Sequence, residues 1–144
     1  MKNLGIKKLT SGSQSDIVNT KRARGSISFE WYRSSAGCPF RKYIESLPKE
    51  DKAKILARIV DVEKHGIKIS IDAEWVKKIE DNLYEIRVTD GKQLRGLYFH
   101  YVSDRYVITN GFTKKQGPVP ENEKRIARQL RKEYFGRICE NEEE

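Results

Sequence analysis

The stretch LYEIRVTDGKQLRGLYFHYVSDRYVITNGFTKK, residues 83–115, decides the fold. It contains three runs rich in aromatic and β-branched residues, a composition typical of strands. The runs span residues 83–88, 94–102 and 106–112. Asp90-Gly91 lies between the first two runs, and Asp-Gly is a strong signal for a tight hairpin turn. Since Ser103-Asp104 separates the last two, the stretch predicts an antiparallel meander of three strands.

Two further strands are predicted before the meander. Apolar and other side chains alternate along residues 26–33, as in a strand with one buried face. Residues 75–79 form a second short candidate, separated from the meander by Asp81-Asn82. Together with the meander, these segments predict a mainly antiparallel sheet of about four to five strands.

Three helices are predicted around this sheet. A short helix begins at Pro39 and stops before Pro48, and a second helix continues to Gly66. The two form a helical hairpin whose apolar side covers one face of the sheet, and a last helix runs from Pro120 to Gly136. The apolar rows are Ile55, Ile59 and Val62 in the second helix, and Ile126, Leu130 and Tyr134 in the last. The order of elements predicts an α+β fold.

Charge divides the chain into three parts. Residues 1–25 form a basic extension, residues 26–137 form one domain, and residues 138–144 form an acidic tail. The 29 Lys and Arg against 21 Asp and Glu give a net charge of +8, which rises to +12 without the four glutamates at positions 140 and 142–144. Such an excess suits a polyanion such as nucleic acid, and a solvated basic surface explains it equally well.

Several classes of protein are disfavoured by the sequence. Cys38 and Cys139 have neither CxxC spacing nor a nearby histidine pair, so we expect reduced thiols and no metal site. No apolar run approaches the roughly 18 residues that span a bilayer. The chain also has no glycine-rich phosphate loop, no Ser-His-Asp signature and no carboxylate cluster for magnesium. We expect a cytoplasmic protein without membrane contacts and without a cofactor.

Arg87 and Arg95 are the first candidate site residues. Alternation along residues 83–88 places Glu85 and Arg87 on the face opposite Tyr84, Ile86 and Val88. An arginine there suits a phosphate because its planar fork donates two parallel hydrogen bonds, although a surface ion pair is the simpler interpretation. Arg95 lies across the hairpin, and alternation groups it with Leu97, a core direction unless a bulge intervenes near Gly96. Its direction stays open.

Further cations and rings belong to the same meander. The cations are Lys77, Lys78, Lys114 and Lys115, and the rings are Tyr98, His100 and Phe112. Several cations on one open sheet would hold a phosphodiester and stabilise its pentacovalent transition state. An exposed Tyr98 or Phe112 would stack on a base, and His100, Glu85 or a lysine would move a proton, although each ring is more often part of a core.

The order of motifs resembles one family. Residues 27–137 resemble the phage-derived, HigB-like branch of the RelE/ParE toxin superfamily. The matching motifs are CPFRKYIESLP, LYEIRV, QLRGLYFHY, ITNGFTKK and PENEKRIARQL.

The resemblance implies a RelE-like fold with a curved sheet. It implies the toxin of a toxin–antitoxin pair, usually a ribosome-dependent endoribonuclease that cuts mRNA without a metal. Arg87, Arg95, Lys114 and Lys115 would line the RNA site, with Lys77 or Lys78 beside them. The expected partners are an antitoxin of the helix-turn-helix type, mRNA and the ribosome. Two alternatives remain: a ParE-like, non-catalytic inhibitor of a protein such as DNA gyrase, and a phage nucleic-acid-binding protein.

Overall fold

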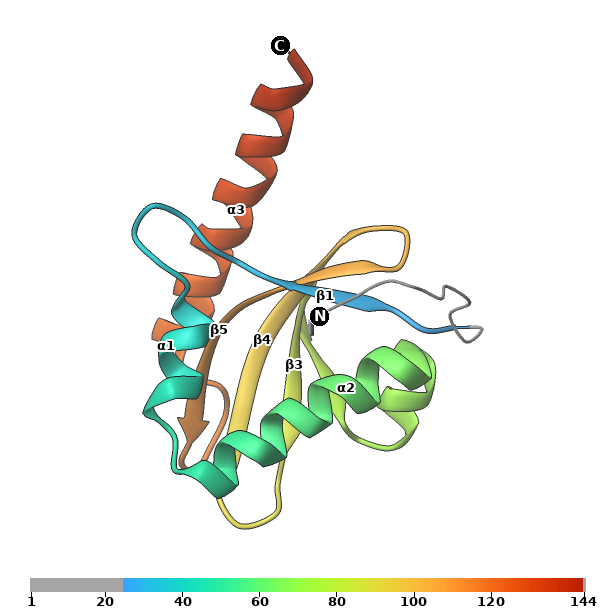
Figure 1. Ribbon diagram of the computed structural model, residues 1–144, viewed down its shortest axis with the longest axis vertical. Coiled ribbons are helices and arrows are strands. Elements are labelled where there is room, and N and C mark those ends of the chain that lie inside the picture. Colours follow the sequence, from blue (N-terminus) through green and yellow to red (C-terminus); the bar gives the residue numbers. More distant parts are fainter. Residues whose placement is uncertain (1–24, 144) are drawn as a thin grey trace, which may run out of the picture.

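The structure is a computed structural model that describes residues 25–143 (Figure 1). Almost all of the predicted basic extension, residues 1–24, therefore lies outside the described residues. The elements are β1 (Ser28–Trp31), α1 (Pro39–Ser46), α2 (Lys49–Asp72), β2 (Val76–Glu80), β3 (Leu83–Val88), β4 (Gln93–Val102), β5 (Arg105–Lys114) and α3 (Glu121–Glu143). Every strand and helix predicted from the sequence is present.

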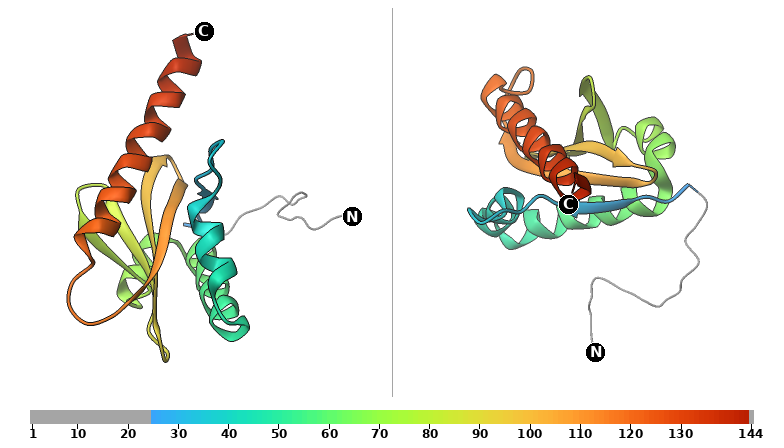
Figure 2. Two further views of the ribbon diagram at one scale, coloured as in Figure 1. Left: turned by 90° about the vertical axis from the view of Figure 1, so that its left-hand side faces the viewer. Right: turned by 90° about the horizontal axis from the view of Figure 1, so that it is seen from above.

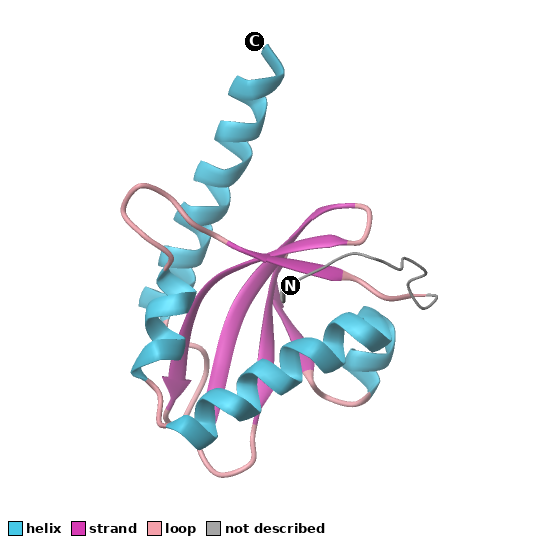
Figure 3. Ribbon diagram, in the orientation of Figure 1, coloured by secondary structure: helices cyan, strands magenta, loops and turns pink. Residues whose placement is uncertain are grey.

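The strands form one five-stranded sheet in the order β1-β5-β4-β3-β2 (Figure 3). β2, β3, β4 and β5 pair antiparallel in succession, so the predicted meander is confirmed. β1 pairs parallel with β5 and makes the sheet mixed. The α+β fold class and the mainly antiparallel sheet are both confirmed.

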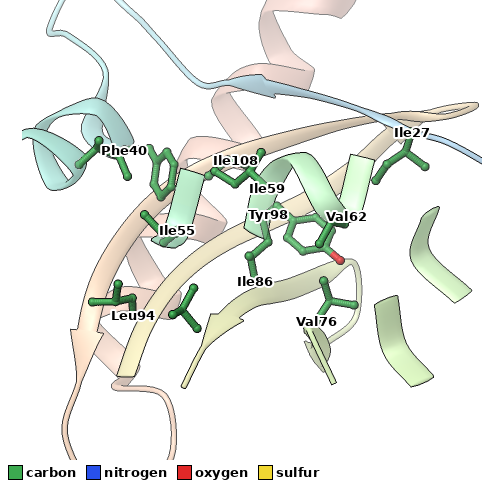
Figure 4. Packing of buried hydrophobic residues seen from close by; sticks show 12 residues of the cluster. Ile27, Phe40, Ile55, Ile59, Val62, Val76, Ile86, Leu94, Tyr98 and Ile108 are labelled. Atoms are coloured by element: carbon green, nitrogen blue, oxygen red, sulfur yellow. The ribbon is translucent and has the colours of Figure 1, made fainter. Parts of the chain in front are cut away.

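α1 and α2 cover one face of the sheet, which we call the α2 face. α1 lies over β5, and α2 crosses β3 and β2 (Figure 1). The predicted apolar row of α2 is buried here, because Ile55 and Val62 have no exposed area and Ile59 has only 6%. These side chains pack with Ile86, Tyr98 and the other core residues labelled in Figure 4.

α3 covers the opposite face, which we call the α3 face (Figure 2). It contacts mainly β5 and β4, where Ala127 packs with Leu97 and Phe112. The row predicted for this helix is partly wrong, because Ile126 is 36% exposed and Ala127 is fully buried. Tyr134 is buried as predicted. Both faces of the sheet therefore carry apolar side chains.

Two glycines were predicted to end helices. Gly66 does interrupt α2, with φ 86° and ψ 173°, but a short helical segment continues beyond it to Asp72. The predicted end of α3 at Gly136 is wrong, since the helix runs on to Glu143. Beyond Gly136, Arg137 Nη1 donates to the Arg33 carbonyl at 3.0 Å, and its guanidinium lies over the Tyr32 ring. These tertiary contacts offset the cost of a helical glycine, about 1 kcal/mol.

Arg128 and Arg131 attach α3 to the end of β2 and to the turn that follows it. Its Nε and Nη2 donate to the two carboxylate oxygens of Glu80 at 2.6 and 2.9 Å, and its Nη1 donates to Glu121 at 2.9 Å. Arg131 adds hydrogen bonds to the carbonyls of Asp81 and Asn82 at 3.1 and 2.8 Å. Two basic residues of α3 are thus engaged within the protein.

This attachment should weaken in acid. The hydrogen bonds from Arg128 lower the pKa of Glu80, and those from Arg128 and Lys124 lower the pKa of Glu121, below the ordinary 4.5. Carboxylates of this kind stabilise the fold fully above pH 4.5, and the contribution is lost as the pH falls through the lowered pKa. We expect Arg128→Gln to unfold at lower urea concentration than the native chain at about pH 6, and the difference to shrink towards about pH 3.

Urea unfolding followed by circular dichroism at both pH values checks this expectation. Arg125→Gln is the matched control, because Arg125 is exposed on the same helix and hydrogen-bonds only to Asn122 among the described residues. A gap between Arg128→Gln and the native chain that stays constant with pH would contradict the assignment.

Candidate nucleic-acid interface

The strand register brings four of the predicted cations to the α3 face. Arg87 is paired with Arg95, and Arg95 with Phe112, whose ring packs under α3. Gln93 is paired with Lys114, and Lys77 with Glu85. Directly opposed residues of an antiparallel pair share a face. Lys77, Glu85, Arg87, Arg95 and Lys114 therefore lie on one face, and we call this set the basic face.

The direction of Arg95, which the sequence leaves open, is now settled. β3 and β4 keep a regular register through the Arg87–Arg95 pair, so Arg95 shares its face with Leu97. A register shift does occur near Gly96, but it lies in the pairing of β4 with β5. Thr109 and Asn110 of β5 are both buried there, and Thr109 Oγ1 donates to the Leu97 carbonyl at 3.2 Å. Arg95 thus points to the same side as Arg87.

Arg95 is buried on the basic face, with 1% of its area exposed. Its Nη1 donates to the carbonyls of Val88 and Leu94 at 3.2 and 3.0 Å, and its Nη2 donates to Gln93 Oε1 at 2.7 Å. Burial lowers the pKa of its guanidinium from the ordinary value. In this arrangement, the fork of Arg95 is occupied by the hairpin between β3 and β4.

Glu85 lies between the two arginines. Its side chain is 2% exposed, and its Oε1 is 3.5 Å from Arg87 Nε and 3.6 Å from Arg95 Nε. The ion pair that the sequence offered as the simpler interpretation of Arg87 is therefore present. Glu85 Oε2 has no hydrogen-bond partner among the described residues.

Arg87 keeps part of its side chain in solvent, with 23% exposed. Its backbone N–H donates to the Trp75 carbonyl at 2.7 Å, and its carbonyl accepts a hydrogen bond from Arg58. Arg58 also places its guanidinium over the Trp75 ring. Within the described chain, Glu85 is the partner of the Arg87 guanidinium, and the terminal nitrogens form no hydrogen bond. They remain able to donate to a ligand.

The lysines divide between the two faces. Lys77 is exposed on the basic face, and Lys114 is half-buried at its edge. Lys115 follows β5 and is exposed beside Lys114. Lys78 is paired with Tyr84, whose ring packs on the α2 face, so this lysine lies on the other side of the sheet.

None of the three rings predicted to bind RNA or to move a proton is exposed beside the cations of the basic face. Tyr98 has no exposed area and lies in the core on the α2 face (Figure 4). Its ring packs against Phe29, Tyr84 and Tyr106, and burial raises the pKa of its hydroxyl. Phe112 is on the correct face but is only 7% exposed beneath α3. Neither ring can stack on a base without rearrangement.

His100 is also remote from Arg87. It contacts the ring of Tyr106 on the α2 face, and its Nε2 lies 2.8 Å from the Ser103 carbonyl at the far end of β4.

Arg58 is a neighbour of Arg87 that was not predicted from the sequence. A cation beside the apolar row of a helix commonly extends along the apolar surface to reach a polar partner, and Arg58 lies between Ile55 and Ile59. That pattern indicates an extended side chain, but only the tertiary structure identifies the Arg87 carbonyl as its acceptor.

Two further observations concern membrane-spanning helices and metal sites. Residues 25–143 contain no helix that is both long and apolar enough to cross a membrane. In that same part of the chain, no group of three or more His, Cys, Asp or Glu side chains could hold a metal ion. Cys38 is buried and Cys139 exposed, and both are free thiols.

Comparison with known proteins places the chain in a family. A family model described as Phage derived protein Gp49-like (DUF891) matches residues 42–132, which include most of the chain from α1 to α3 and all of the basic face. No curated protein matches the chain. Because the match spans well over half of the 144 residues, the chain belongs to the phage-derived Gp49-like family, which is related to the toxins of toxin–antitoxin systems.

Proposed function

We propose that this protein is the toxin of a toxin–antitoxin pair and acts as a metal-independent, ribosome-dependent mRNA endoribonuclease of the HigB-like type. The observation that carries the proposal is the placement of Arg87. Its terminal nitrogens are free of described partners, and Lys77 and Lys114 lie on the same face. An antitoxin, expected to be of the helix-turn-helix type, would cover this face until the toxin is released.

The proposed reaction needs positioning and charge. The 2′-hydroxyl oxygen attacks the adjacent phosphorus, a new 2′-O–P bond forms, and the P–O5′ bond breaks. The 2′-hydroxyl proton is lost and the 5′ oxygen gains one, which leaves a cyclic phosphate and a free 5′-hydroxyl. Arg87 would donate to the non-bridging oxygens, whose negative charge increases in the transition state. Lys77, Lys114 and Lys115 would hold the neighbouring phosphates. Of the other residues predicted to be catalytic, Arg95 is buried and His100 lies on the α2 face.

A non-catalytic alternative is favoured by a specific observation. His100 lies on the opposite face of the sheet from Arg87, and Glu85, the carboxylate beside Arg87, is buried. A surface with few proton carriers suits an inhibitor that binds a protein target such as DNA gyrase. A phage nucleic-acid-binding protein would use the same cations, with affinity that follows salt and tolerates Arg to Lys changes.

Induced expression in a bacterial host tests the proposal. We expect the native chain to arrest growth and to produce new mRNA ends inside translated codons. Arg87→Ala should reduce cleavage by about 100-fold or more, which is typical for the loss of a group that stabilises transition-state charge. Arg41→Ala is the matched control, because Arg41 is exposed on α1. It should arrest growth like the native chain.

The other outcomes are distinct. Growth arrest with DNA damage signalling and uncut mRNA would favour the gyrase-type inhibitor. A chain that leaves growth unaffected would contradict the toxin proposal and leave the nucleic-acid-binding alternative.

A further inference from the structure

We propose that Glu85 and Arg95 are positioning residues that orient the Arg87 guanidinium towards a phosphodiester. The inference rests on the proposed function, since it concerns the same basic face. It assigns different roles to residues that the sequence groups together: Arg87 contacts the ligand, while Glu85 and Arg95 act through Arg87.

Glu85 needs a nearby positive charge because its carboxylate is buried. Removing a carboxylate from water is costly unless a cation compensates. Two guanidinium groups do so here, and both present Nε to the same carboxylate oxygen, at 3.5 and 3.6 Å. The three side chains together carry one net positive charge.

Arg95 is the fixed member of this cluster. Its Nη atoms are bound to the Val88 and Leu94 carbonyls and to Gln93, and it is 1% exposed. It cannot turn outward without losing these hydrogen bonds. Its role is therefore to supply a fixed countercharge beside the buried Glu85 carboxylate and to hold that side chain in place.

Arg87 is the free member. Its Nε lies 3.5 Å from Glu85 Oε1 without forming a hydrogen bond, and its two terminal nitrogens have no hydrogen-bond partner among the described residues. Its backbone is fixed on both sides by the Trp75 carbonyl and by Arg58. Glu85 thus limits the side-chain freedom of Arg87 before any ligand binds, which reduces the entropic cost of binding.

A purely electrostatic role and a positioning role of Glu85 predict opposite changes in RNA affinity for one substitution. Glu85→Gln removes a negative charge beside the interface, so a purely electrostatic role predicts tighter RNA binding. Positioning predicts weaker binding, because Arg87 loses the partner that orients it. Glu45→Gln is the matched control, since Glu45 is an exposed carboxylate on α1 and its loss changes the net charge equally.

The first experiment measures binding of the full chain to a single-stranded RNA whose 2′-hydroxyls are methylated, which prevents cleavage. We expect Glu85→Gln to bind about fivefold to tenfold more weakly than the native chain, within the usual range of coupling between contacting residues. Glu45→Gln should bind at least as tightly as the native chain. In the Arg87→Ala background, Glu85→Gln should cause no further loss. Equal or tighter binding by Glu85→Gln, or additive losses in the double variant, would overturn the proposal.

The second experiment needs no variant that alters the core. We expect the Nε–H proton of Arg87 in the native chain to give a resolved NMR signal that exchanges with water more slowly than that of the exposed Arg41. Exchange as fast as that of Arg41 would overturn the positioning role, whatever the RNA result. If both binding and exchange support the positioning role but the native chain leaves translated mRNA uncut, the positioning role stands and the proposed endoribonuclease function fails.

Discussion

Arg95→Met is expected to lower the free energy of unfolding by about 3 to 5 kcal/mol, the usual cost of removing one partner from a buried ion pair. Methionine fills much of the volume but leaves the Glu85 carboxylate buried without its fixed countercharge. Three hydrogen bonds within the β3–β4 hairpin are lost as well, of which the one to the Val88 carbonyl joins the two strands. Urea denaturation at neutral pH, followed by circular dichroism, measures the change. The expected loss is a large share of the roughly 5 to 15 kcal/mol that stabilises an ordinary domain.

Two further variants test whether the charge cluster of Glu85, Arg87 and Arg95 causes the loss of stability. Arg87→Met removes the partly exposed member of the same cluster and should cost less than about 1 kcal/mol. Adding Glu85→Met to Arg95→Met removes the stranded carboxylate, so the double variant should be more stable than Arg95→Met alone. A double variant as unstable as the sum of its single changes would show that the charge cluster does not determine the effect.

Gly66→Ala is expected to destabilise the fold by about 3 kcal/mol, from backbone strain and overpacking together. Gly66 adopts φ 86° and ψ 173°, a conformation essentially restricted to glycine. A Cβ there would lie 2.0 Å from the Gly25 carbonyl oxygen, so the backbone entering β1 must move. That backbone is hydrogen-bonded to α2, because the Ile27 N–H donates to the Glu63 carbonyl at 2.9 Å.

Gly117→Ala separates the two contributions. Gly117 also has a positive φ, 91°, but among the described residues no atom beyond its chain neighbours lies within 4 Å of the position that a Cβ would take. It should lose only the strain component, about 1 kcal/mol or slightly more. The melting temperatures of both variants, measured by calorimetry, test the comparison. Equal losses would mean that the contact with Gly25 is unimportant.

The sheet was predictable because its signals are local. Asp90-Gly91 and Ser103-Asp104 mark turns, and the runs between them have the composition of strands. The parallel pairing of β1 with β5 was not predictable, since its partners lie at opposite ends of the domain. The shift of the α3 row from Ile126 to Ala127 was also hidden, because a small alanine gives a weak hydrophobic signal.

The candidate site was less predictable than the fold. Alternation correctly separated Arg87 from the core beneath α2. It could not show which arginine is exposed, because helices cover both faces and apolar neighbours surround Arg95 as they surround Tyr98. The burial of Tyr98 and Phe112 follows from the same cause. The contact between Glu85 and the two arginines depends on the cross-strand register, which no single strand reveals.

The parallel pairing of β1 has a consequence for the order of folding during synthesis. Ser28–Trp31 leaves the ribosome early, but its partner residues 105–108 emerge only after the other strands. Non-local pairing of this kind slows folding, because a long loop must close before its contacts form. Lys114 emerges later still. The growing chain therefore completes its cation-bearing surface only after the last strand of the sheet has left the ribosome.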